Sequence, residues 1–389
     1  MNTQSALTEF TNSILHGLDG SRNTAGIFCD LSKAFDCVDH SVLLLKLHDY
    51  GIGGNCLSLL KSYLTKRKQR TVIQENYNKV YSNWKSNSVG VPQGSILGPL
   101  FFLIFINDLP RSITKDLILF ADDTTAIIKS STSEELIITL SEVMDDLDSW
   151  FHSNGLKLNI DKTQVIKFGI RNNKNGNFNF PNLVDSHKFL GIKIDSNFKW
   201  KAHLNDLLSK LRSISFIFLH LRENVSFDVL KSVYHGYVES ILSYGIVLWG
   251  LAPGIKTVFR LQKRIIRIMT NSHFRAPCKS LFRNKKILTL TSLYIYELLV
   301  YIHLSKDQLI EDLRFQHNYN TRNNANFRIP LHRSTFYEKS PLYSGLILYN
   351  NLPLTFKSMT IGKFKNELKT VLIDKAIYEI DELQLNLLS

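Results

Sequence analysis

Two adjacent aspartates, Asp122 and Asp123, interrupt the apolar stretch LILFADDTTAII, and a third carboxylate, Asp30, directly follows the apolar stretch AGIFC. Burying a carboxylate without a partner costs several kcal/mol, so folding alone does not account for these charges. Mg²⁺ prefers oxygen ligands, and two Mg²⁺ ions about 4 Å apart promote in-line phosphoryl transfer. If the two stretches form neighbouring strands, the carboxylates meet at one sheet edge and could bind metal. For the pair alone, a hairpin turn is the simpler interpretation.

The segments that position these carboxylates have the patterns of an α+β domain. AGIFC predicts a short strand, and LILFADDTTAII predicts two strands with the aspartates at the bend. A helix is predicted from Ser133 to Ser153, where Thr132 and Glu135 form a capping box and apolar residues repeat every three or four positions. Two further strands are predicted in LKLNIDKTQVIKFG and HKFLGIKID, with the polar loop IRNNKNGNFN between them. DHSVLLLKLHDYGI predicts another helix, and RTVIQENYNKVYSNWKS is rich in strand-forming residues.

From about Lys199 the pattern becomes helical. In the helix predicted around residues 255–271, the basic residues share one face and the apolar residues lie on or near the other. The basic residues are Arg260, Lys263, Arg264 and Arg267. Such a face can follow the phosphates of a nucleic acid, or it can be a solvated face of a bundle helix. The same two interpretations apply to KRKQR, residues 66–70.

Composition separates an acidic part of the chain from a basic part. The 389 residues carry a net charge of +13, yet residues 1–150 hold 13 Lys and Arg against 17 Asp and Glu. The remainder therefore carries +17, which suits a polyanionic partner. The four cysteines show no C-x-x-C spacing and fit a reducing compartment, and no signal peptide is evident. A membrane span needs about 20 apolar residues. The longest apolar runs, residues 96–106 and 288–304, are shorter than this or are interrupted, so we expect them to be buried inside the protein.

Five segments occur in the order in which reverse transcriptases carry their polymerase motifs. They are DLSKAFDCVDH, SVGVPQGSILGPLFFLIFINDLP, LFADDTT, NGLKLNIDKTQVIKF and HKFLGIKID. From about Thr24 to Asp195 the chain resembles the reverse transcriptases of non-LTR, LINE-type retrotransposons, especially jockey and CR1-like elements. LSYGIVLWG, HNYNTR and GLILYNNLP resemble recurrent C-terminal segments of the same elements, although the residues themselves indicate only helix packing and loops.

The resemblance implies an RNA-directed DNA polymerase that adds deoxynucleotides to a primer 3′-hydroxyl with two Mg²⁺ ions, for which Mn²⁺ can substitute. Asp30 and Asp122 match the two carboxylates that hold both metals, and Asp123 matches the neighbour that assists them. Lys162 matches a lysine proposed to protonate the leaving pyrophosphate. A lysine at this position is also typical of a solvated strand end.

Further matches concern the nucleotide and the template. Phe35 matches the aromatic residue beneath the deoxyribose that excludes a 2′-hydroxyl, and a core phenylalanine is the alternative. Gln93 and Gly94 match positions beside the template base and the incoming nucleotide, where a missing Cβ permits close approach. A turn after Pro92 accounts for the same residues. FLGI matches the hairpin that grips the primer terminus, and its apolar side chains are equally explained by packing.

The resemblance predicts three regions: a right-hand polymerase palm with incomplete fingers over residues 1–198, a helical thumb-like region over residues 199–310, and a C-terminal region of unknown function over residues 311–389. The palm is expected as a small antiparallel sheet backed by helices. About 24 residues precede the first motif strand, fewer than the family's fingers region, so an N-terminally truncated copy is expected. The expected partners are an RNA template, a DNA primer and deoxynucleoside triphosphates, with no membrane, inside the cell in the nucleus or cytoplasm and not secreted.

Two other functions stay open at this point. The first is a truncated, catalytically inactive copy that binds nucleic acid without polymerising, which the basic half of the chain favours. The second is an unrelated two-metal phosphatase or nuclease, for which Asp36, Asp39 and His40 offer further ligands. PQGS has no role in that second chemistry.

Overall fold

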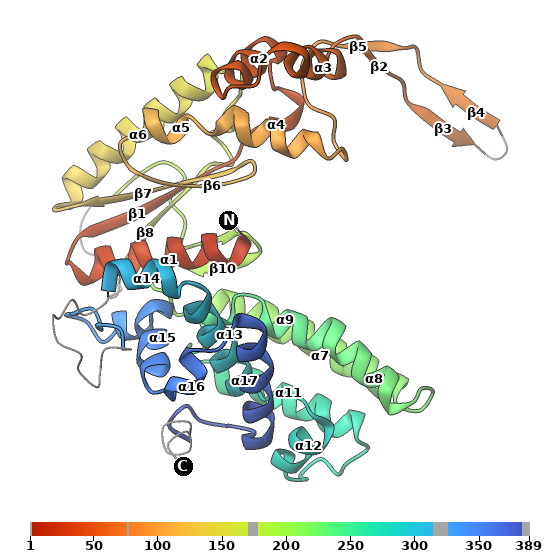
Figure 1. The fold of residues 1–389 in the computed structure, drawn as a ribbon, viewed down its shortest axis with the longest axis vertical. Helices are drawn as coiled ribbons and strands as arrows, with labels where there is room; N and C mark the ends of the chain where they lie inside the picture. The colour runs from red at the N-terminus through yellow and green to blue at the C-terminus, as the bar shows by residue number, and fades with distance from the viewer. Residues whose placement is uncertain (1, 76–77, 170–177, 314–325, 383–389) are drawn as a thin grey trace. The chain divides into compact units, whose positions relative to one another are not determined.

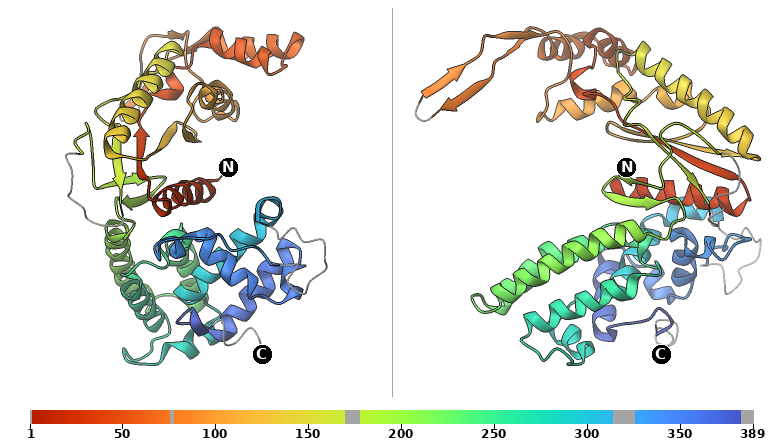
Figure 2. Two further views of the ribbon diagram at one scale, coloured as in Figure 1. Left: turned by 90° about the vertical axis from the view of Figure 1, so that its left-hand side faces the viewer. Right: turned by 180° about the vertical axis from the view of Figure 1, so that it is seen from behind.

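The computed structural model describes residues 2–75, 78–169, 178–313 and 326–382, and its fold is α+β (Figure 1, Figure 2). The chain divides into two compact units. The first, here called the sheet unit, comprises Arg22–Phe168 and Asn173–Asp185. The second, the helical unit, comprises Met1–Ser21, Gly169–Asn172 and Ser186–Ser389. The predicted α+β fold is confirmed.

A four-stranded antiparallel sheet forms the centre of the sheet unit. Its strand order is β6 (Asp116–Phe120), β7 (Asp123–Ser130), β1 (Asn23–Cys29) and β8 (Gln164–Phe168). β1 lies between β7 and β8 and is buried after its first residue, as its run of Ala, Gly, Ile, Phe and Cys predicts. The predicted hairpin of LILFADDTTAII is confirmed as β6 and β7, joined at Ala121 and Asp122.

Helices cover one face of this sheet, on which alternate strand residues point into a shared core. α6 (Ser133–Ser153) packs on β7 and β1, and its predicted cap is present because the Thr132 hydroxyl accepts a hydrogen bond from the Glu135 N–H. α4 (Leu97–Ile106) and α2 (His40–Asp49) complete the cover with α3 (Gly54–Leu64) beside α2 (Figure 1). The core contains Ala25, Ile27, Ala126, Ile128, Val165, Leu140, Leu147, Phe101 and Phe105. Burying each Val, Leu, Ile or Phe side chain contributes about 1.5–3 kcal/mol, so this face fixes the strand register.

Two short hairpins follow α3. β2 (Arg67–Gln69) pairs with β5 (Lys85–Asn87), and β3 (Val72–Glu75) pairs with β4 (Asn78–Tyr81). In Figure 1 these strands project beyond α3, away from the four-stranded sheet. The segment from β2 to β5, residues 66–87, is called the arm below.

The helical unit begins with α1 (Thr3–Asp19) and contains the hairpin of β9 (Ser186–Phe189) and β10 (Ile192–Asp195). The residue pattern of HKFLGIKID predicted one strand, whereas the resemblance implied a hairpin at FLGI. The segment forms a hairpin, because Leu190 and Gly191 both take positive φ and turn the chain. The remaining helices are α7 (Lys201–Leu221), α8 (Phe227–Val233), η2 (Tyr234–Glu239), α9 (Ser240–Ser243), α10 (Ile246–Trp249), α11 (Ile255–Met269), α12 (Cys278–Lys285), α13 (Leu290–Leu304), α14 (Lys306–Leu313), η3 (Tyr337–Lys339), α15 (Pro341–Asn350), α16 (Leu354–Lys357) and α17 (Ile361–Lys375).

α13 buries most of its side chains and packs against α15 and α17. Both apolar runs singled out in the sequence, α4 and α13, bury side chains within their own helix clusters. No single helix in the described part of the chain is long and apolar enough to cross a membrane, and only α12 with α13, bent by 50° between them, reaches the required length and composition.

The two compact units do not have the borders at residues 198 and 310 that the sequence predicted. α1 and the β9–β10 hairpin belong to the helical unit, where Phe10 and Phe189 bring their ring centroids to 5.2 Å. Residues 326–382 belong to the same unit, because α15 and α17 pack on α13. The functional borders of palm, thumb and C-terminal region stay predictions. Most of the loop IRNNKNGNFN and all of HNYNTR lie outside the described residues.

Candidate active site

The three carboxylates lie at one edge of the four-stranded sheet. β1 and β7 pair up to Cys29 opposite Thr124, so the next residues in register are Asp30 and Asp123. β6 and β7 pair up to Phe120 opposite Asp123, which leaves Asp122 in the turn beside them. Cys29 belongs to the core beneath the helices, so the alternation of β1 places Asp30 on the opposite face of the sheet.

The backbone on both sides of Asp30 is held by the segment that precedes β8. The Asp30 carbonyl accepts a hydrogen bond of 2.8 Å from the Asn159 N–H, and Thr163 Oγ1 accepts one of 3.5 Å from the Asp30 N–H. Lys162 lies in the same turn, with its Nζ 3.8 Å from Asp30 Oδ2. Both side chains remain open to solvent, at 70% exposure for Lys162 and 48% for Asp30. The structure therefore brings Lys162 to the carboxylates from 132 residues away in the chain.

Electrostatics at this edge favour a cation. Although Asp123 is accessible to solvent, the surrounding protein desolvates its carboxylate and raises its pKa, and the charges of Asp122 and Asp30 raise it further. Crowded oxygen donors with mutual repulsion suit a hard divalent ion. Within the described ranges no three His, Cys, Asp or Glu side chains are gathered closely enough to hold a metal ion as they stand.

Phe35, Gln93 and Gly94 are brought together by a second set of contacts in the sheet unit. The Val91 N–H donates to the Phe35 carbonyl at 2.8 Å, and Gln93 Nε2 donates to Asp36 Oδ1 at 3.1 Å. Phe35 is half-buried and stacks on Phe102, with 4.7 Å between ring centroids. Both interpretations of Phe35, core packing and an exposed site face, are therefore compatible with its position.

Glycines shape the same segment in two ways. Gly94 has a φ of +80° and no atom within 4 Å of the place that a Cβ would occupy, so its backbone is open to solvent. Gly90 has a φ of +88°, and a Cβ there would stand 2.8 Å from the Asp36 carbonyl oxygen. The Gly90 N–H also donates to the Val38 carbonyl at 2.8 Å. The role of Gly90 in joining the Phe35 and Gln93 segments was not predicted, and the only signal in the sequence was a glycine two residues before Pro92.

In the helical unit, the segment LSYGIVLWG supports the β9–β10 hairpin that carries FLGI. The Tyr244 hydroxyl donates a hydrogen bond to the Leu190 carbonyl, and its ring lies against Gly191. Trp249 is fully buried, and its Nε1–H donates to the Tyr244 carbonyl at 3.1 Å. The sequence interpretation of this segment as helix packing agrees with these contacts, but the tyrosine's hold on the hairpin turn was missed.

The basic helix is α11, and its basic residues differ in exposure. Arg260 and Arg264 are exposed. Lys263 Nζ lies 4.6 Å from the Phe259 ring centroid and 5.2 Å from that of Tyr378. Arg267 Nε donates to the Ala276 carbonyl at 2.9 Å. Lys263 and Arg267 therefore have structural contacts, which periodicity alone could not reveal.

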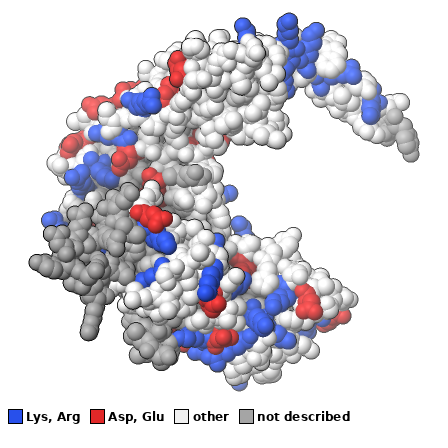
Figure 3. Space-filling model, viewed as in Figure 1, with Lys and Arg blue, Asp and Glu red and all other residues white. Residues whose placement is uncertain are grey.

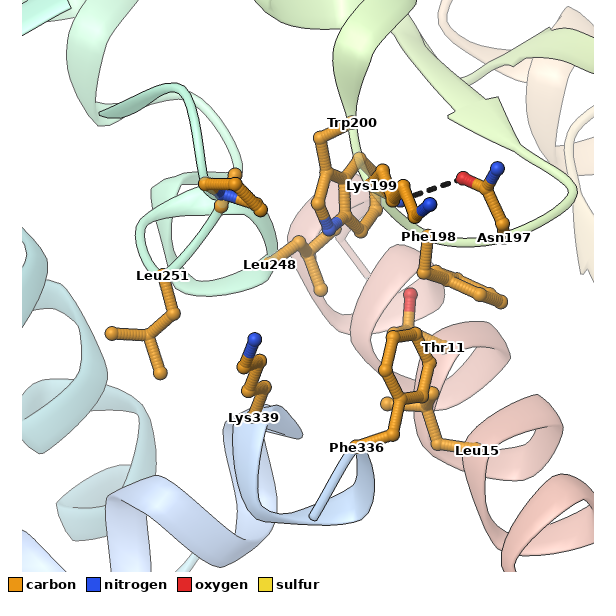
Figure 4. Close-up of a pocket in the computed structure, with 12 residues that line it drawn as sticks. Thr11, Leu15, Asn197, Phe198, Lys199, Trp200, Leu248, Leu251, Phe336 and Lys339 are labelled. Atoms are coloured by element: carbon orange, nitrogen blue, oxygen red, sulfur yellow. Dashed lines mark hydrogen bonds between the residues drawn. The ribbon is translucent and has the colours of Figure 1, made fainter. Parts of the chain in front are cut away.

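A separate cavity of about 210 Å³ lies in the helical unit and contains none of the predicted site residues. Figure 4 shows the rings of Phe198, Trp200 and Phe336 around it, with Lys339 reaching in from one side. The Thr11 hydroxyl in its wall is buried and has no hydrogen-bond partner among the residues that the structure describes. The site residues predicted from the sequence thus lie outside this cavity.

This antiparallel sheet, with three carboxylates at one edge and helices on its other face, agrees with the polymerase palm that the sequence predicted. Residues 3–194 match the family model described as reverse transcriptase (RNA-dependent DNA polymerase), so this part of the chain is a reverse transcriptase domain.

The relatives of this chain are proteins of non-LTR retrotransposons. The probable RNA-directed DNA polymerase from transposon X-element of Drosophila melanogaster is 24% identical over 301 residues, which cover 74% of this chain and 33% of that protein. The RNA-directed DNA polymerase from mobile element jockey of Drosophila funebris is 27% identical over 283 residues, which cover 68% of this chain and 30% of that protein. The resemblance to non-LTR elements is confirmed, and the chain spans about a third of the length of these relatives.

Among solved structures, apo telomerase from Candida tropicalis is similar at a TM-score of 0.39 and 13% identity, covering 72% of this chain and 56% of that one.

Proposed function

We propose that this chain is the polymerase part of a non-LTR retrotransposon protein and catalyses RNA-templated addition of deoxynucleotides to a primer 3′-hydroxyl. The observation that carries the proposal is the meeting of Asp30, Asp122 and Asp123 at one sheet edge within a domain of the reverse transcriptase family. Reverse transcriptases generally depend on divalent metal ions, and an all-oxygen donor set with mutual repulsion fits such ions.

Asp30 and Asp122 would hold two Mg²⁺ ions, or Mn²⁺ in their place, with Asp123 as the supporting ligand. When bound, the ions activate the primer hydroxyl and neutralise charge on the triphosphate. Lys162, 3.8 Å from Asp30, would donate a proton to the departing pyrophosphate. Its exposed ammonium is free to turn toward a phosphate, because an ion pair at this distance and exposure holds it weakly.

The Phe35 segment would select the nucleotide. Phe35 is braced from below by Phe102, so a sugar placed on its open side meets a ring that cannot easily retreat. Gln93 and Gly94 would lie along the base pair that forms between template and incoming nucleotide. The open backbone of Gly94 permits that approach, since no side chain fills the space.

An RNA template and a DNA primer are the proposed partners of the whole protein. In the helical unit, Arg260 and Arg264 on α11 are the exposed cations that would contact phosphates. The net charge of +17 on residues 151–389 supports a polyanionic partner.

Primer extension on poly(rA) annealed to oligo(dT), with Mg²⁺ or Mn²⁺, tests the proposal. Asp122→Asn should abolish incorporation. Asp116→Asn is the matched control, because Asp116 lies in the same hairpin and removes the same charge at its far end, where it pairs with Lys129. Incorporation that survives Asp122→Asn would sink the proposal. Salt-dependent binding without incorporation by the unsubstituted chain would favour the non-catalytic alternative.

A further inference from the structure

The arm, residues 66–87, carries charge and aromatic surface that the polymerase chemistry does not use. Its sequence holds six basic residues, Lys66, Arg67, Lys68, Arg70, Lys79 and Lys85, and one acidic residue, Glu75. None of the six basic side chains forms an ion pair with an acidic residue in the described part of the chain. Figure 3 shows this basic surface running along the arm without acidic neighbours on the visible face. An uncompensated basic strip of this kind attracts a polyanion.

Both faces of the β3–β4 ribbon are apolar and exposed. Val72 pairs with Tyr81 on one face and Ile73 pairs with Val80 on the other, and all four are at least 47% exposed. An isolated two-stranded hairpin is marginally stable in water, and exposed apolar patches usually mark a binding surface. The ribbon therefore has the properties of a surface that is covered in the working complex.

Two rings on the arm are oriented by a third side chain. The Arg70 guanidinium lies 4.1 Å from the Tyr81 ring centroid and 4.6 Å from the Trp84 ring centroid. The Thr71 N–H donates to Ser82 Oγ at 2.9 Å and the Ser82 N–H donates to the Thr71 carbonyl at 3.0 Å, which fixes the strand ends that carry these rings. Trp84 remains 60% exposed. Ordered rings beside cations are the arrangement on which unpaired bases stack.

We propose that the arm binds single-stranded RNA, with bases stacking on Tyr81 and Trp84 and phosphates contacting the basic residues. Rings ordered by a guanidinium favour a strand with unpaired bases over a duplex, whose bases are already stacked. The identity of this strand as the unpaired template rests on the proposed function; the binding itself does not.

Fluorescence anisotropy of a labelled 12-nucleotide oligo(rU) with the full chain, in EDTA and without nucleotides, tests the inference. Loss of a stacked base is expected to weaken binding by at least about fivefold in Trp84→Ala. Trp84→Phe keeps a ring and should recover most of the affinity. Lys68→Gln should flatten the plot of log K against log[salt] by about 0.7 if one phosphate contact is lost.

Leu59→Ala is the matched control, because Leu59 on α3 is 66% exposed and lies outside the arm. All variants change exposed side chains, and equal thermal melting confirms that they fold. Unchanged oligo(rU) affinity in Trp84→Ala would overturn the inference. So would self-association through the ribbon, seen as a dimer that Trp84→Ala converts to a monomer, or binding to phosphatidylserine vesicles that oligo(rU) does not displace. The binding assay contains no metal and no nucleotides, so its outcome does not depend on catalysis. RNA binding by the arm can therefore be present when primer extension fails, and absent when primer extension succeeds.

Discussion

Replacing Gly90 by alanine tests whether the Phe35 and Gln93 segments are joined as the structure shows. A Cβ at Gly90 would stand 2.8 Å from the Asp36 carbonyl oxygen, 3.0 Å from its Cα and 3.1 Å from its carbonyl carbon. These are backbone atoms and cannot move aside as a flexible side chain would. Adding an atom to such a packed place costs about 1–3 kcal/mol. The positive φ of +88° adds about 1–2 kcal/mol for any residue with a Cβ.

Gly94→Ala is the matched control for this substitution. Gly94 has a similar φ of +80°, but nothing lies within 4 Å of the added Cβ. Gly94→Ala should therefore lower the free energy of unfolding by about 1–2 kcal/mol, the cost of the positive φ alone, whereas Gly90→Ala should lower it by about 2–5 kcal/mol.

Hydrogen exchange of the buried β1 amides measures the free energy of unfolding of the sheet unit in both variants. Gly90→Ala should unfold the more easily of the two, and exchange should rise first at Val91, whose N–H bonds to Phe35. Equal losses in the two variants would refute the close approach of Gly90 to Asp36. In primer extension the two variants are not expected to rank as they do in stability. Gly94→Ala should lower nucleotide incorporation by more than its small loss of stability explains.

Four further predictions address single side chains. Asp123→Asn should raise the melting temperature of the metal-free chain at pH 7, since the raised pKa of Asp123 means that its ionised form destabilises the fold, and the gain should vanish as the pH falls below the ordinary Asp pKa. Lys162→Gln should change the free energy of unfolding by less than about 1 kcal/mol, so the melting temperature should change little. The same substitution should reduce the rate of nucleotide incorporation. Burial lowers the pKa of His203 to about 4, so the helical unit should lose stability as the pH falls from 6.5 toward 4, and His203→Gln should remove that dependence in urea titrations. Tyr244→Phe should cost about 1 kcal/mol and increase exchange at the β9–β10 turn, and unchanged exchange would contradict the bond to Leu190.

Local signals in the sequence were sufficient for the elements that carry the carboxylates. The apolar run before Asp30 and the apolar flanks of Asp122 predict strands because buried strands need such residues on both sides of the charge. The Thr132 cap predicted the start of α6, since the groups that satisfy a helix end lie within four residues of it. These predictions succeeded because the physics that decides them acts between near neighbours in the chain.

The tertiary structure decided which distant segments meet. Lys162 reaches Asp30, Gly90 meets Asp36, and Tyr244 holds the turn at Leu190, each across a gap of more than 50 residues. A helical repeat likewise showed that α11 has a basic face, but only packing showed that Lys263 and Arg267 are engaged by Tyr378 and Ala276. Periodicity states which side of a helix a residue occupies and not what that side contacts. The sequence by itself therefore determined the chemistry available at the sheet edge, and the fold determined which side chains share it, because contacts between distant segments depend on the packing of the whole core.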